Sequence, residues 1–355
     1  MSFLSLLATA RPEIEAELLR ALKDLRAENA SRFPLDTWLI DEAVRRVNLG
    51  KLLRGSLALG VWSAYGGSDR RTAVQAAAAV ELYGTGILMQ DDVTDRSGTR
   101  RGLPTIHVIA QEKAQELQLE DSVHFGENCG TYLGDILYFT AHGLLAKLEL
   151  PVQKLQDINA LCARELWMLG FAQLEDIRLS KLPPSDRTVT QQHILSMLAG
   201  KTGRYSVAWP LCTGALLADA PPSELEQLAK IGESIGVLYQ LRDDELGVFG
   251  DPAVTGKSVD DDIREGKKTL YWLSLVEQLE PQDPLWRTFA NPDATVQEIE
   301  SVRQFLRSSG IEKARHNELI ARQSELAQEL KDVSLPPAVI SLLEQLLTFV
   351  VDREK

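Results

Sequence analysis

The chain has 355 residues, of which 44% are hydrophobic and 25% are charged, so it has the composition of an ordinary globular protein. This composition excludes a disordered chain, a collagen-like chain and a small disulfide scaffold. With 38 Lys and Arg against 51 Asp and Glu, the net charge is −13. Such a balance argues against nucleic acid or an anionic membrane as the main partner, because both require clustered basic residues.

Helical periodicity of apolar residues dominates the chain from end to end. The pattern predicts long helices at residues 11–30, 70–92, 127–148, 152–180, 223–246, 295–309, 311–331 and 335–351. Convincing β-alternation is missing, and clusters of Gly and Pro fall between the helical segments, so we expect one all-α domain over residues 1–355. Residues 249–268 lack an apolar stripe, which predicts a long ordered loop of the kind that often carries function.

Neither the cysteines nor the hydropathy point to an extracellular or membrane protein. Cys129, Cys162 and Cys212 lie far apart without CxxC spacing, which indicates neither a zinc site nor a disulfide framework. The N-terminus is briefly apolar but lacks a basic segment, so it predicts an amphipathic helix rather than a signal peptide. No stretch reaches the about 18 uncharged apolar residues that a membrane helix needs. We therefore expect a cytoplasmic protein.

Three carboxylates, Asp91, Asp92 and Asp95, end the long apolar helix predicted at residues 70–92. Acidic side chains at a helix C-terminus oppose the helix dipole, so this placement makes sense if cations neutralise them. Carboxylate, water and phosphate oxygens suit Mg²⁺, which takes only one or two protein carboxylates per ion. Taken alone, the motif is equally well explained as a solvated acidic helix end.

A second acidic pair, Asp243 and Asp244, follows another apolar helical run and decides between these interpretations. Each motif is followed by basic residues, which are Arg96, Arg100 and Arg101 after the first and Lys257, Lys267 and Lys268 after the second. Carboxylates that hold Mg²⁺ beside Arg and Lys make a site for diphosphate. Two parallel arrangements of this kind predict a binding site for diphosphate substrates.

These motifs resemble, in the same order, those of the trans-type (head-to-tail) isoprenyl diphosphate synthases, or polyprenyl synthetases, and the likeness is strongest over residues 45–275. The matching segments are Gly50-Lys51-Leu52-Leu53-Arg54, Asp91-Asp92-Val93-Thr94-Asp95, Arg100-Arg101-Gly102-Leu103-Pro104-Thr105, Ala172-Gln173-Leu174-Glu175-Asp176, Lys201-Thr202, Tyr239-Gln240-Leu241-Arg242-Asp243-Asp244 and Glu265-Gly266-Lys267-Lys268-Thr269. The resemblance implies an antiparallel helical bundle around a deep central cavity, with the two acidic motifs facing each other across its mouth, and a homodimer.

The resemblance also implies a Mg²⁺-dependent prenyltransferase that condenses isopentenyl diphosphate with dimethylallyl, geranyl or farnesyl diphosphate. The allylic diphosphate ionises, the double bond of isopentenyl diphosphate attacks the cation, and loss of a proton restores an alkene. By the same resemblance, Mg²⁺ would be held by Asp91, Asp95 and Asp243 with support from Asp92 and Asp244. The substrates would be bound by Lys51, Arg54, Arg100, Arg101, Gln173, Lys201, Lys257 and Lys267, while Thr202 and Gln240 would stabilise positive charge near the allylic carbon.

The sequence departs from the family pattern at three positions. Gly84 and Gln90 stand where the family often has His, and Gly247 stands where many members have a third Asp in the second motif. Gly84 puts one contact to isopentenyl diphosphate in doubt, although Lys51 and Arg54 remain. Because Asp243 and Asp244 are intact, we expect an active enzyme.

Product length should depend on the side chains that precede the first acidic motif. Tyr83, Gly86 and Ile87 lie one to two turns before Asp91, where they can face a growing chain. With room at Gly86 and Tyr83 as the floor, we expect geranylgeranyl diphosphate (C20), with C25 or longer or farnesyl diphosphate (C15) as alternatives. A class I terpene cyclase, or a regulatory subunit of a heteromeric synthase, is a further alternative.

Overall fold

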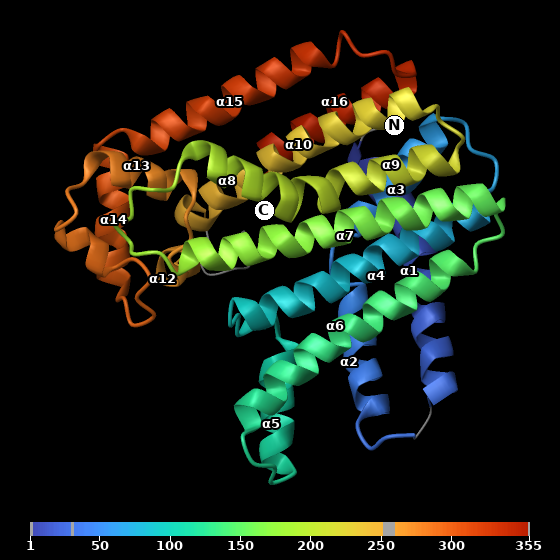
Figure 1. Cartoon of the computed structure of the whole chain (residues 1–355), viewed down its shortest axis with the longest axis horizontal. Coiled ribbons are helices and arrows are strands. Elements are labelled where there is room, and N and C mark those ends of the chain that lie inside the picture. Colours follow the sequence, from blue (N-terminus) through green and yellow to red (C-terminus); the bar gives the residue numbers. More distant parts are fainter. Residues whose placement is uncertain (1–2, 30–31, 251–259, 354–355) are drawn as a thin grey trace. The chain divides into compact units, whose positions relative to one another are not determined.

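A computed structural model of the protein describes residues 3–29, 32–250 and 260–353. Helices make up most of these residues (Figure 1). Two short strands, β1 (Thr99–Arg100) and β2 (Leu103–Pro104), pair as an antiparallel hairpin. The predicted all-α class is confirmed, with this hairpin as a small addition.

The chain forms two compact units. Unit 1 contains the chain up to residue 161 together with residues 210–225, and unit 2 contains residues 162–209 and 226 onward. The helices that begin in unit 1 are α1 (Phe3–Asn29), α2 (Asp36–Val47), α3 (Leu53–Ala64), α4 (Arg70–Thr94), α5 (Ile106–Glu116), α6 (Ser122–Ala146), α7 (Val152–Ser180) and α10 (Pro222–Phe249). Helix α9 (Trp209–Leu217) lies in unit 1 except for its first residue. The expectation of a single domain over residues 1–355 stays a prediction.

Helix α4 forms the centre of unit 1. Asp69 caps its N-terminus by accepting a hydrogen bond from the backbone N–H of Thr72 (3.1 Å). Its alanine-rich middle is buried, and the helix packs against α1, α3 and α6. Small residues let α4 and α6 approach closely, because a Cβ built at Gly86 would lie 2.7 Å from the carbonyl oxygen of Gly134. This close packing against neighbouring helices fixes the position of the acidic C-terminal end of α4.

Unit 2 contains the remaining helices. These are α8 (Gln191–Leu198), the π-helix η1 (Ala199–Ala208), α12 (Asp261–Glu265), α13 (Leu270–Gln278), the 3₁₀-helix η2 (Pro284–Arg287), α14 (Val296–Ser308), α15 (Ile311–Glu329) and α16 (Pro337–Asp352). The backbones of η1 and α10 touch, since a Cβ built at Gly203 would lie 2.8 Å from the carbonyl oxygen of Glu233. This close approach places the Lys201-Thr202 pair beside the second acidic motif.

The predicted helix positions agree with the structure to within a few residues, except at the N-terminus and in the predicted loop. Helix α1 begins at Phe3 rather than at residue 11 and continues through Pro12. The prediction of a loop at residues 249–268 is wrong for residues 261–265, which form α12. Gly266 ends this turn with a left-handed φ of 74°, a conformation that glycine adopts readily. Part of the predicted loop, residues 251–259, lies outside the described residues.

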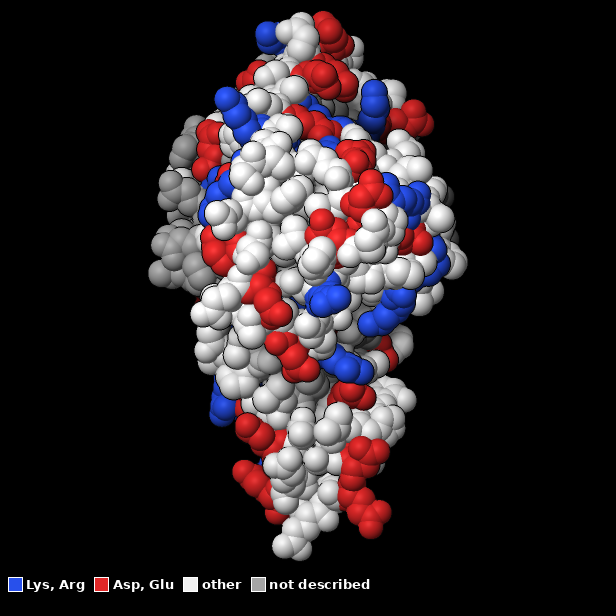
Figure 2. Space-filling model, turned by 90° about the vertical axis from the view of Figure 1, so that its left-hand side faces the viewer, with Lys and Arg blue, Asp and Glu red and all other residues white. Residues whose placement is uncertain are grey.

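Two observations bear on the sequence-based exclusions. Among the described helices, none combines the length and the apolar character required to cross a membrane. On the face drawn in Figure 2, acidic and basic side chains are interspersed, and the basic ones form no single broad patch.

Candidate functional site

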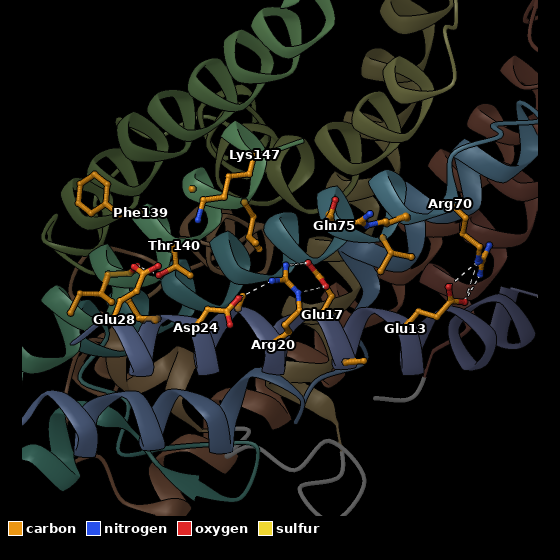
Figure 3. Close-up of a pocket in the computed structure, with 18 residues that line it drawn as sticks. Glu13, Glu17, Arg20, Asp24, Glu28, Arg70, Gln75, Phe139, Thr140 and Lys147 are labelled. Carbon is orange, nitrogen blue, oxygen red and sulfur yellow. Dashed lines mark hydrogen bonds and ion pairs between the residues drawn. The ribbon is translucent and has the colours of Figure 1, made fainter. Parts of the chain in front are cut away.

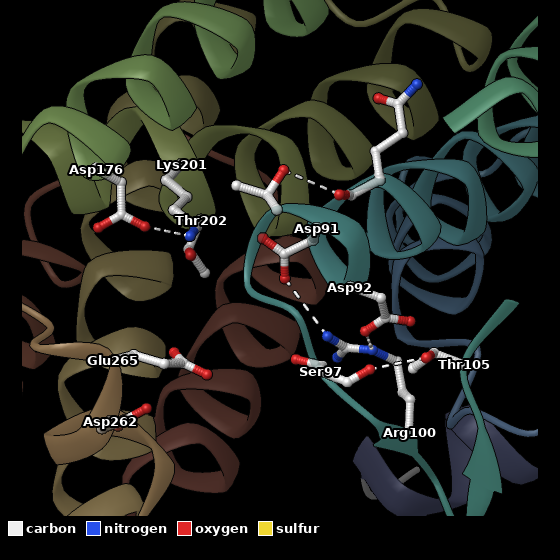
Figure 4. A network of polar contacts seen from close by, with 12 residues as sticks. Asp91, Asp92, Ser97, Arg100, Thr105, Asp176, Lys201, Thr202, Asp262 and Glu265 are labelled. Carbon is white, nitrogen blue, oxygen red and sulfur yellow. Dashed lines mark hydrogen bonds and ion pairs between the residues drawn. The ribbon is translucent and has the colours of Figure 1, made fainter. Parts of the chain in front are cut away.

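The first acidic motif is neutralised by an arginine from the hairpin that follows it. Arg100 Nε donates to Asp92 Oδ1, and Arg100 Nη2 lies 3.5 Å from Asp91 Oδ2 (Figure 4). Burial raises the pKa of Asp92 to about 6, although Arg100 opposes this shift, and the neighbouring Asp91 and Asp95 add to it. The motif is therefore a compact negative site with one arginine in place.

The hairpin is fixed so that Arg100 keeps this position. Thr105 Oγ1 donates to the carbonyl oxygen of Ser97 (2.8 Å), and the Thr105 N–H donates to the carbonyl oxygen of Gly98 (3.1 Å). Arg46 of α2 donates to the carbonyl oxygen of Pro104 (2.8 Å). Arg101 adopts a left-handed φ of 54°. The sequence motif that follows the acidic residues is thus a tight turn that presents two arginines.

Lys51, Arg54 and Arg101 belong to the same compact unit. Residues 48–50 are anchored by Arg11 of α1, whose Nη1 donates to the carbonyl oxygen of Gly50 (2.7 Å). The Arg101 guanidinium packs on Gly50, because a Cβ there would lie 2.5 Å from Nη1. A Cβ at Gly84 would similarly lie 3.1 Å from Arg54 Cδ. Unit 1 therefore brings together basic residues predicted to bind isopentenyl diphosphate, and Arg54 lies against the position where the family often has His.

The second acidic motif lies near the C-terminal end of α10, within unit 2. Asp244 is buried, and its Oδ2 atom makes no hydrogen bond with any described residue. Burial, together with the nearby carboxylates of Asp262 and Asp243, raises the pKa of Asp244 to about 8. Gln240 Nε2 donates to Asp244 Oδ1 (2.9 Å) and opposes the shift. Without a cation, Asp244 therefore keeps its proton near pH 7, because the crowded carboxylates and the burial disfavour its ionised form.

Asp243 is paired with an arginine from the far end of the chain. Arg353 Nη2 donates to Asp243 Oδ1 (3.0 Å) and to the carbonyl oxygen of Tyr239 (2.9 Å). Its guanidinium stacks on the Tyr239 ring, with Cζ 3.7 Å from the ring centroid. In return, the carbonyl oxygen of Arg353 accepts hydrogen bonds from Arg242 Nε (3.1 Å) and Nη2 (3.0 Å). The end of α16 is thus fastened to the second motif.

Gly247, which replaces the third Asp of the second motif, leaves space for another carboxylate. A Cβ built at Gly247 would collide with Asp262 Oδ2 from α12. Asp262 Oδ1 accepts a hydrogen bond from Lys267 Nζ (2.8 Å), and Lys267 also lies 3.2 Å from Glu265 Oε2. The structure therefore supplies a carboxylate beside α10 from a residue that the sequence analysis did not single out.

The Lys201-Thr202 pair lies on the π-helix η1 and is connected to the second motif by hydrogen bonds. Lys201 Nζ donates to Asp176 Oδ2 of α7 (Figure 4). Thr202 Oγ1 donates to Gln240 Oε1 (2.8 Å), and Gln240 donates in turn to Asp244. π-helical turns often occur at functional sites. Gln173 also belongs to α7, whereas the predicted substrate residue Lys257 lies outside the described residues.

The residues predicted to set product length lie at the contact between α4 and α6. Gly86 does not leave open space beside α4, because a Cβ there would lie 2.8 Å from Tyr138 Cε1 of α6. Close packing of the two helices fills the space on this side of Gly86. The role of Gly86 in product length stays a prediction. Tyr83 is buried, and its ring centroid lies 5.9 Å from that of Tyr138. Ile87 is also buried.

Gln90, which replaces the His that often precedes the first acidic motif, belongs to the same contact between α4 and α6. Its Nε2 donates to Asp135 Oδ1 (2.7 Å), and its Oε1 accepts from Tyr138 Oη (2.9 Å). Gln90 therefore fixes the Tyr138 ring that packs beside Tyr83. The sequence gives no local sign of this role, because Tyr138 follows 48 residues later.

A large groove in unit 1 contains none of the predicted site residues. It has a volume of about 1170 Å³ and lies between α1, α4 and α6 (Figure 3). Ion pairs line one wall, among them Arg20 with Glu17 and Asp24, and Arg70 with Glu13. Phe139 and Ile136 of α6 supply apolar surface. The groove is therefore a surface feature distinct from the acidic motif.

The donor set of the two acidic motifs fits Mg²⁺ shared with a diphosphate. No three His, Cys, Asp or Glu side chains among the described residues converge into a complete metal cage. Mg²⁺ commonly uses one or two carboxylates and completes its shell with phosphate oxygens and water. The buried and unsatisfied Asp244 Oδ2, beside two further carboxylates, favours a cation at the second motif. Asp91, Asp95 and Asp243 offer hard oxygen ligands of the required kind.

Sequence reasoning missed four polar residues that the structure places in contact with, or next to, predicted site residues or the acidic motifs. Asp176 was quoted only as part of a motif, while Asp262, Arg353 and the buried Glu81 were given no role. A buried Glu in the middle of an apolar helix is a detectable signal. The partner of Arg353, by contrast, lies 110 residues away and leaves no local trace.

Paired carboxylates with arginine and lysine on an all-α scaffold fit an enzyme that acts on diphosphate substrates. The sequence model of the polyprenyl synthetase family matches residues 37–306. The chain therefore belongs to the polyprenyl synthetase family, and it is a trans-prenyltransferase.

Individual relatives agree with this assignment. The chain is 32% identical over 271 residues to a geranylgeranyl diphosphate synthase of Mycobacterium tuberculosis, covering 75% of this chain and 70% of that protein. It is 28% identical over 295 residues to the geranylgeranyl diphosphate synthase of Saccharolobus solfataricus, covering 81% and 82%. A crystal structure of geranylgeranyl pyrophosphate synthase from Corynebacterium glutamicum, complexed with isoprenyl diphosphate and magnesium, superimposes with a TM-score of 0.88 at 28% identity. That match covers 97% of this chain and 98% of the other.

Proposed function

We propose that the protein is a Mg²⁺-dependent geranylgeranyl diphosphate synthase that elongates allylic diphosphates with isopentenyl diphosphate. The observation that carries this proposal is the pair of acidic motifs, each provided with its own basic partners. Arg100 contacts Asp91 and Asp92, Arg353 contacts Asp243, and Lys267 contacts Asp262, which lies beside the second motif. The names of the relatives and the magnesium in one solved neighbour support it.

The residues divide into two substrate roles. Arg100, Lys201, Lys257 and Lys267 bind the allylic diphosphate and stabilise the charge that develops as it leaves. Lys51, Arg54 and Arg101 bind isopentenyl diphosphate, while Gln173 adds a polar substrate contact from α7. Thr202 and Gln240 are hydrogen-bonded to each other (2.8 Å), so their dipoles are held in a fixed orientation for a developing carbocation.

Asp91, Asp95 and Asp243 would hold Mg²⁺, with Asp92 and Asp244 in support. When bound, the ions would supply electrostatic stabilisation of the departing diphosphate. The protein itself keeps the carboxylates oriented: Arg100 tethers Asp92, and Gln240 tethers Asp244. Apolar surroundings exclude water from the reactive cation.

The length of the product is set by two aromatic side chains between α4 and α6, the buried Tyr83 and the half-buried Tyr138. Tyr83 packs against Tyr138, whose hydroxyl is held by Gln90 (2.9 Å), so the two rings make a rigid barrier. Tyr83 lies two helical turns before Asp91, which is about 12 Å along the helix axis. This position supports a C20 product, with C25 or longer as the second candidate and C15 as the third.

Incubation of the purified protein with Mg²⁺, isopentenyl diphosphate and each allylic starter tests the proposal. Dephosphorylated products are separated by chromatography, and a C20 alcohol is expected from all three starters. Hydrocarbon formed from a starter alone would show a terpene cyclase. Lack of product until a second protein is added would show a regulatory or partial subunit, and C15 as the end product would overturn the length assignment.

We propose further that the protein is a cytoplasmic homodimer, and that α6 supplies part of the self-association surface. Tyr132, Ile136 and Phe139 are 63%, 37% and 75% exposed and form a stripe at helical spacing. A second copy of the same helix could cover this stripe isologously. Cys129, Cys162 and Cys212 form no disulfide bond, which suits a reducing compartment. Light scattering of wild type and Phe139→Glu should show a dimer and a monomer, respectively; a monomeric wild type would contradict the proposal.

A further inference from the structure

Glu81 is a buried acid in the middle of α4, one turn before the position where the family often has His. The residue is only 5% exposed, although its surroundings on α4 are apolar. Glutamate is almost never buried to this extent unless it is paired. Burial raises the pKa of Glu81, and the positive charges of Arg54 and Arg101 oppose that shift. Glu81 therefore faces the basic residues assigned to isopentenyl diphosphate.

Glu81 also caps a helix to which it does not belong. Leu52, at the N-cap position of α3, has a left-handed φ of 49° and cannot supply a side-chain cap. The free N–H groups of the first turn need an acceptor, and a carboxylate is favoured there by the helix dipole. Glu81 Oε1 accepts the hydrogen bond from the Gly55 N–H (2.7 Å). The N-terminus of α3 is thus already occupied by a carboxylate, which leaves diphosphate binding to the basic side chains.

Gly55 and Gly84 make this arrangement possible. A Cβ at Gly55 would lie 3.0 Å from Glu81 Cγ and 2.8 Å from the carbonyl oxygen of Ala77, so only glycine lets the carboxylate approach. A Cβ at Gly84 would lie 3.1 to 3.3 Å from Arg54 Cδ, Nη1 and Nε. Arg54 therefore lies along α4 beside Gly84, with Glu81 one turn away on the same helix. Because position 84 carries no side chain, the Arg54 side chain has room to lie against α4.

We propose that Glu81 is the positioning residue of the isopentenyl diphosphate site, since its carboxylate fixes the first turn of α3 and orients Arg54 across Gly84. This inference rests on the proposed function, which assigns Arg54 to that substrate. Glu81 touches no reacting atom and acts through Arg54. In this protein Gly84 and Arg54 together take the place of the histidine that the family often has.

Steady-state kinetics of Glu81→Gln test the proposal. The amide oxygen still accepts the Gly55 N–H, but the charge that orients Arg54 is lost, so the KM for isopentenyl diphosphate should rise about tenfold, as expected for a lost charge-assisted contact. The KM for the allylic partner should change less than about twofold. The matched control is Glu318→Gln, because Glu318 of α15 is half-buried, pairs with two arginines, Arg315 and Arg322, and contacts no predicted site residue in the interactions described. It should leave both KM values unchanged.

Gly84→Ala gives a second readout that a purely structural role would not produce. Alanine is favoured over glycine inside a helix by about 1 kcal/mol, so the melting temperature should hold or rise. The new methyl group nevertheless crowds Arg54, so the KM for isopentenyl diphosphate should increase. Direct calorimetric titration of the metal-free variants with isopentenyl diphosphate checks the same loss without turnover.

The outcomes separate this inference from the proposed function. If wild type forms no prenyl diphosphate with any starter, the proposed function fails. If wild type is active and Glu81→Gln raises both KM values equally, or leaves the KM for isopentenyl diphosphate unchanged, the positioning role is wrong while the function stands. If Glu81→Gln does not fold, Gly84→Ala decides. An unchanged KM for isopentenyl diphosphate in Gly84→Ala would then overturn the inference.

Discussion

The two acidic motifs have similar local sequences, but their charge is balanced in different ways. In unit 1, Arg100 neutralises Asp91 and Asp92 from a hairpin only a few residues further along the chain. In unit 2, Asp243 is neutralised by Arg353 from the end of α16, and Asp244 is buried with one oxygen unsatisfied. The pKa values follow this contrast, about 6 for Asp92 and about 8 for Asp244. The second motif therefore depends on distant parts of the chain and has the greater need for a cation.

Removing a predicted metal ligand from either motif should have the largest effect. Asp91→Ala and Asp243→Ala should each lower kcat by about a thousandfold or more, because electrostatic stabilisation of the leaving diphosphate is lost. Circular dichroism should show that both variants remain folded. Turnover near the wild-type value in either variant would contradict the assignment of that motif.

Arg353→Met should affect the second acidic motif and leave the first one unchanged. The variant keeps apolar bulk beside Tyr239 but removes the hydrogen bond from Arg353 to Asp243 Oδ1. The Mg²⁺ concentration for half-maximal activity should therefore change by about tenfold, the effect of one lost charge-assisted contact. The KM for isopentenyl diphosphate should stay constant.

The matched control for Arg353→Met is Arg307→Met, because Arg307 also stacks on an aromatic ring of α10, with Cζ 5.4 Å from the centroid of Phe249, and touches neither acidic motif in the contacts described. An identical response of the two variants would show that Arg353 only packs against α10. Mn²⁺ binding followed by electron paramagnetic resonance gives the same comparison without turnover.

The raised pKa values predict an inverse dependence of stability on pH in the absence of metal. Both carboxyls bind protons more tightly in the folded than in the unfolded protein, so the stability they contribute is present below pH 4 and is lost as pH rises through about 6 and about 8. The melting temperature of metal-free protein should therefore fall between pH 5 and pH 8 through these two groups. Asp244→Asn should flatten the upper part of this slope, whereas Asp332→Asn, at an exposed position, should not. Equal slopes for wild type and Asp244→Asn would refute the assignment.

The smallest effect is expected at the aromatic pair of unit 1. Tyr83→Ala should lengthen the product by one or two isoprene units with little loss of turnover, because the rigid barrier is removed. Tyr138→Ala should act in the same direction, while Tyr132→Ala, at an exposed position on the same helix, should not. If neither Tyr83→Ala nor Tyr138→Ala changes the product distribution, a residue of another helix must form the floor of the cavity.

Much of the fold and of the chemistry can be predicted from the sequence because both leave local patterns. Apolar periodicity places α4, α6, α7 and α10 within a few residues of their observed bounds. The helices missed, such as α3 and α5, are shorter or carry no clear stripe. Residues 261–265 were assigned to a loop because a single helical turn is too short for any periodicity to show.

The acidic motifs, their basic neighbours and the helical class follow from the sequence by itself, since residue type and helical spacing decide them locally. Tertiary structure alone decides which charge meets which. It brings Arg353 to Asp243, sets Asp262 against Gly247, closes α6 over Gly86 and lays Arg54 beside Gly84. These contacts join residues that are far apart along the chain, and glycine leaves space without indicating which group will fill it. The physical reason is that close packing and burial, rather than sequence proximity, determine how each buried charge is compensated.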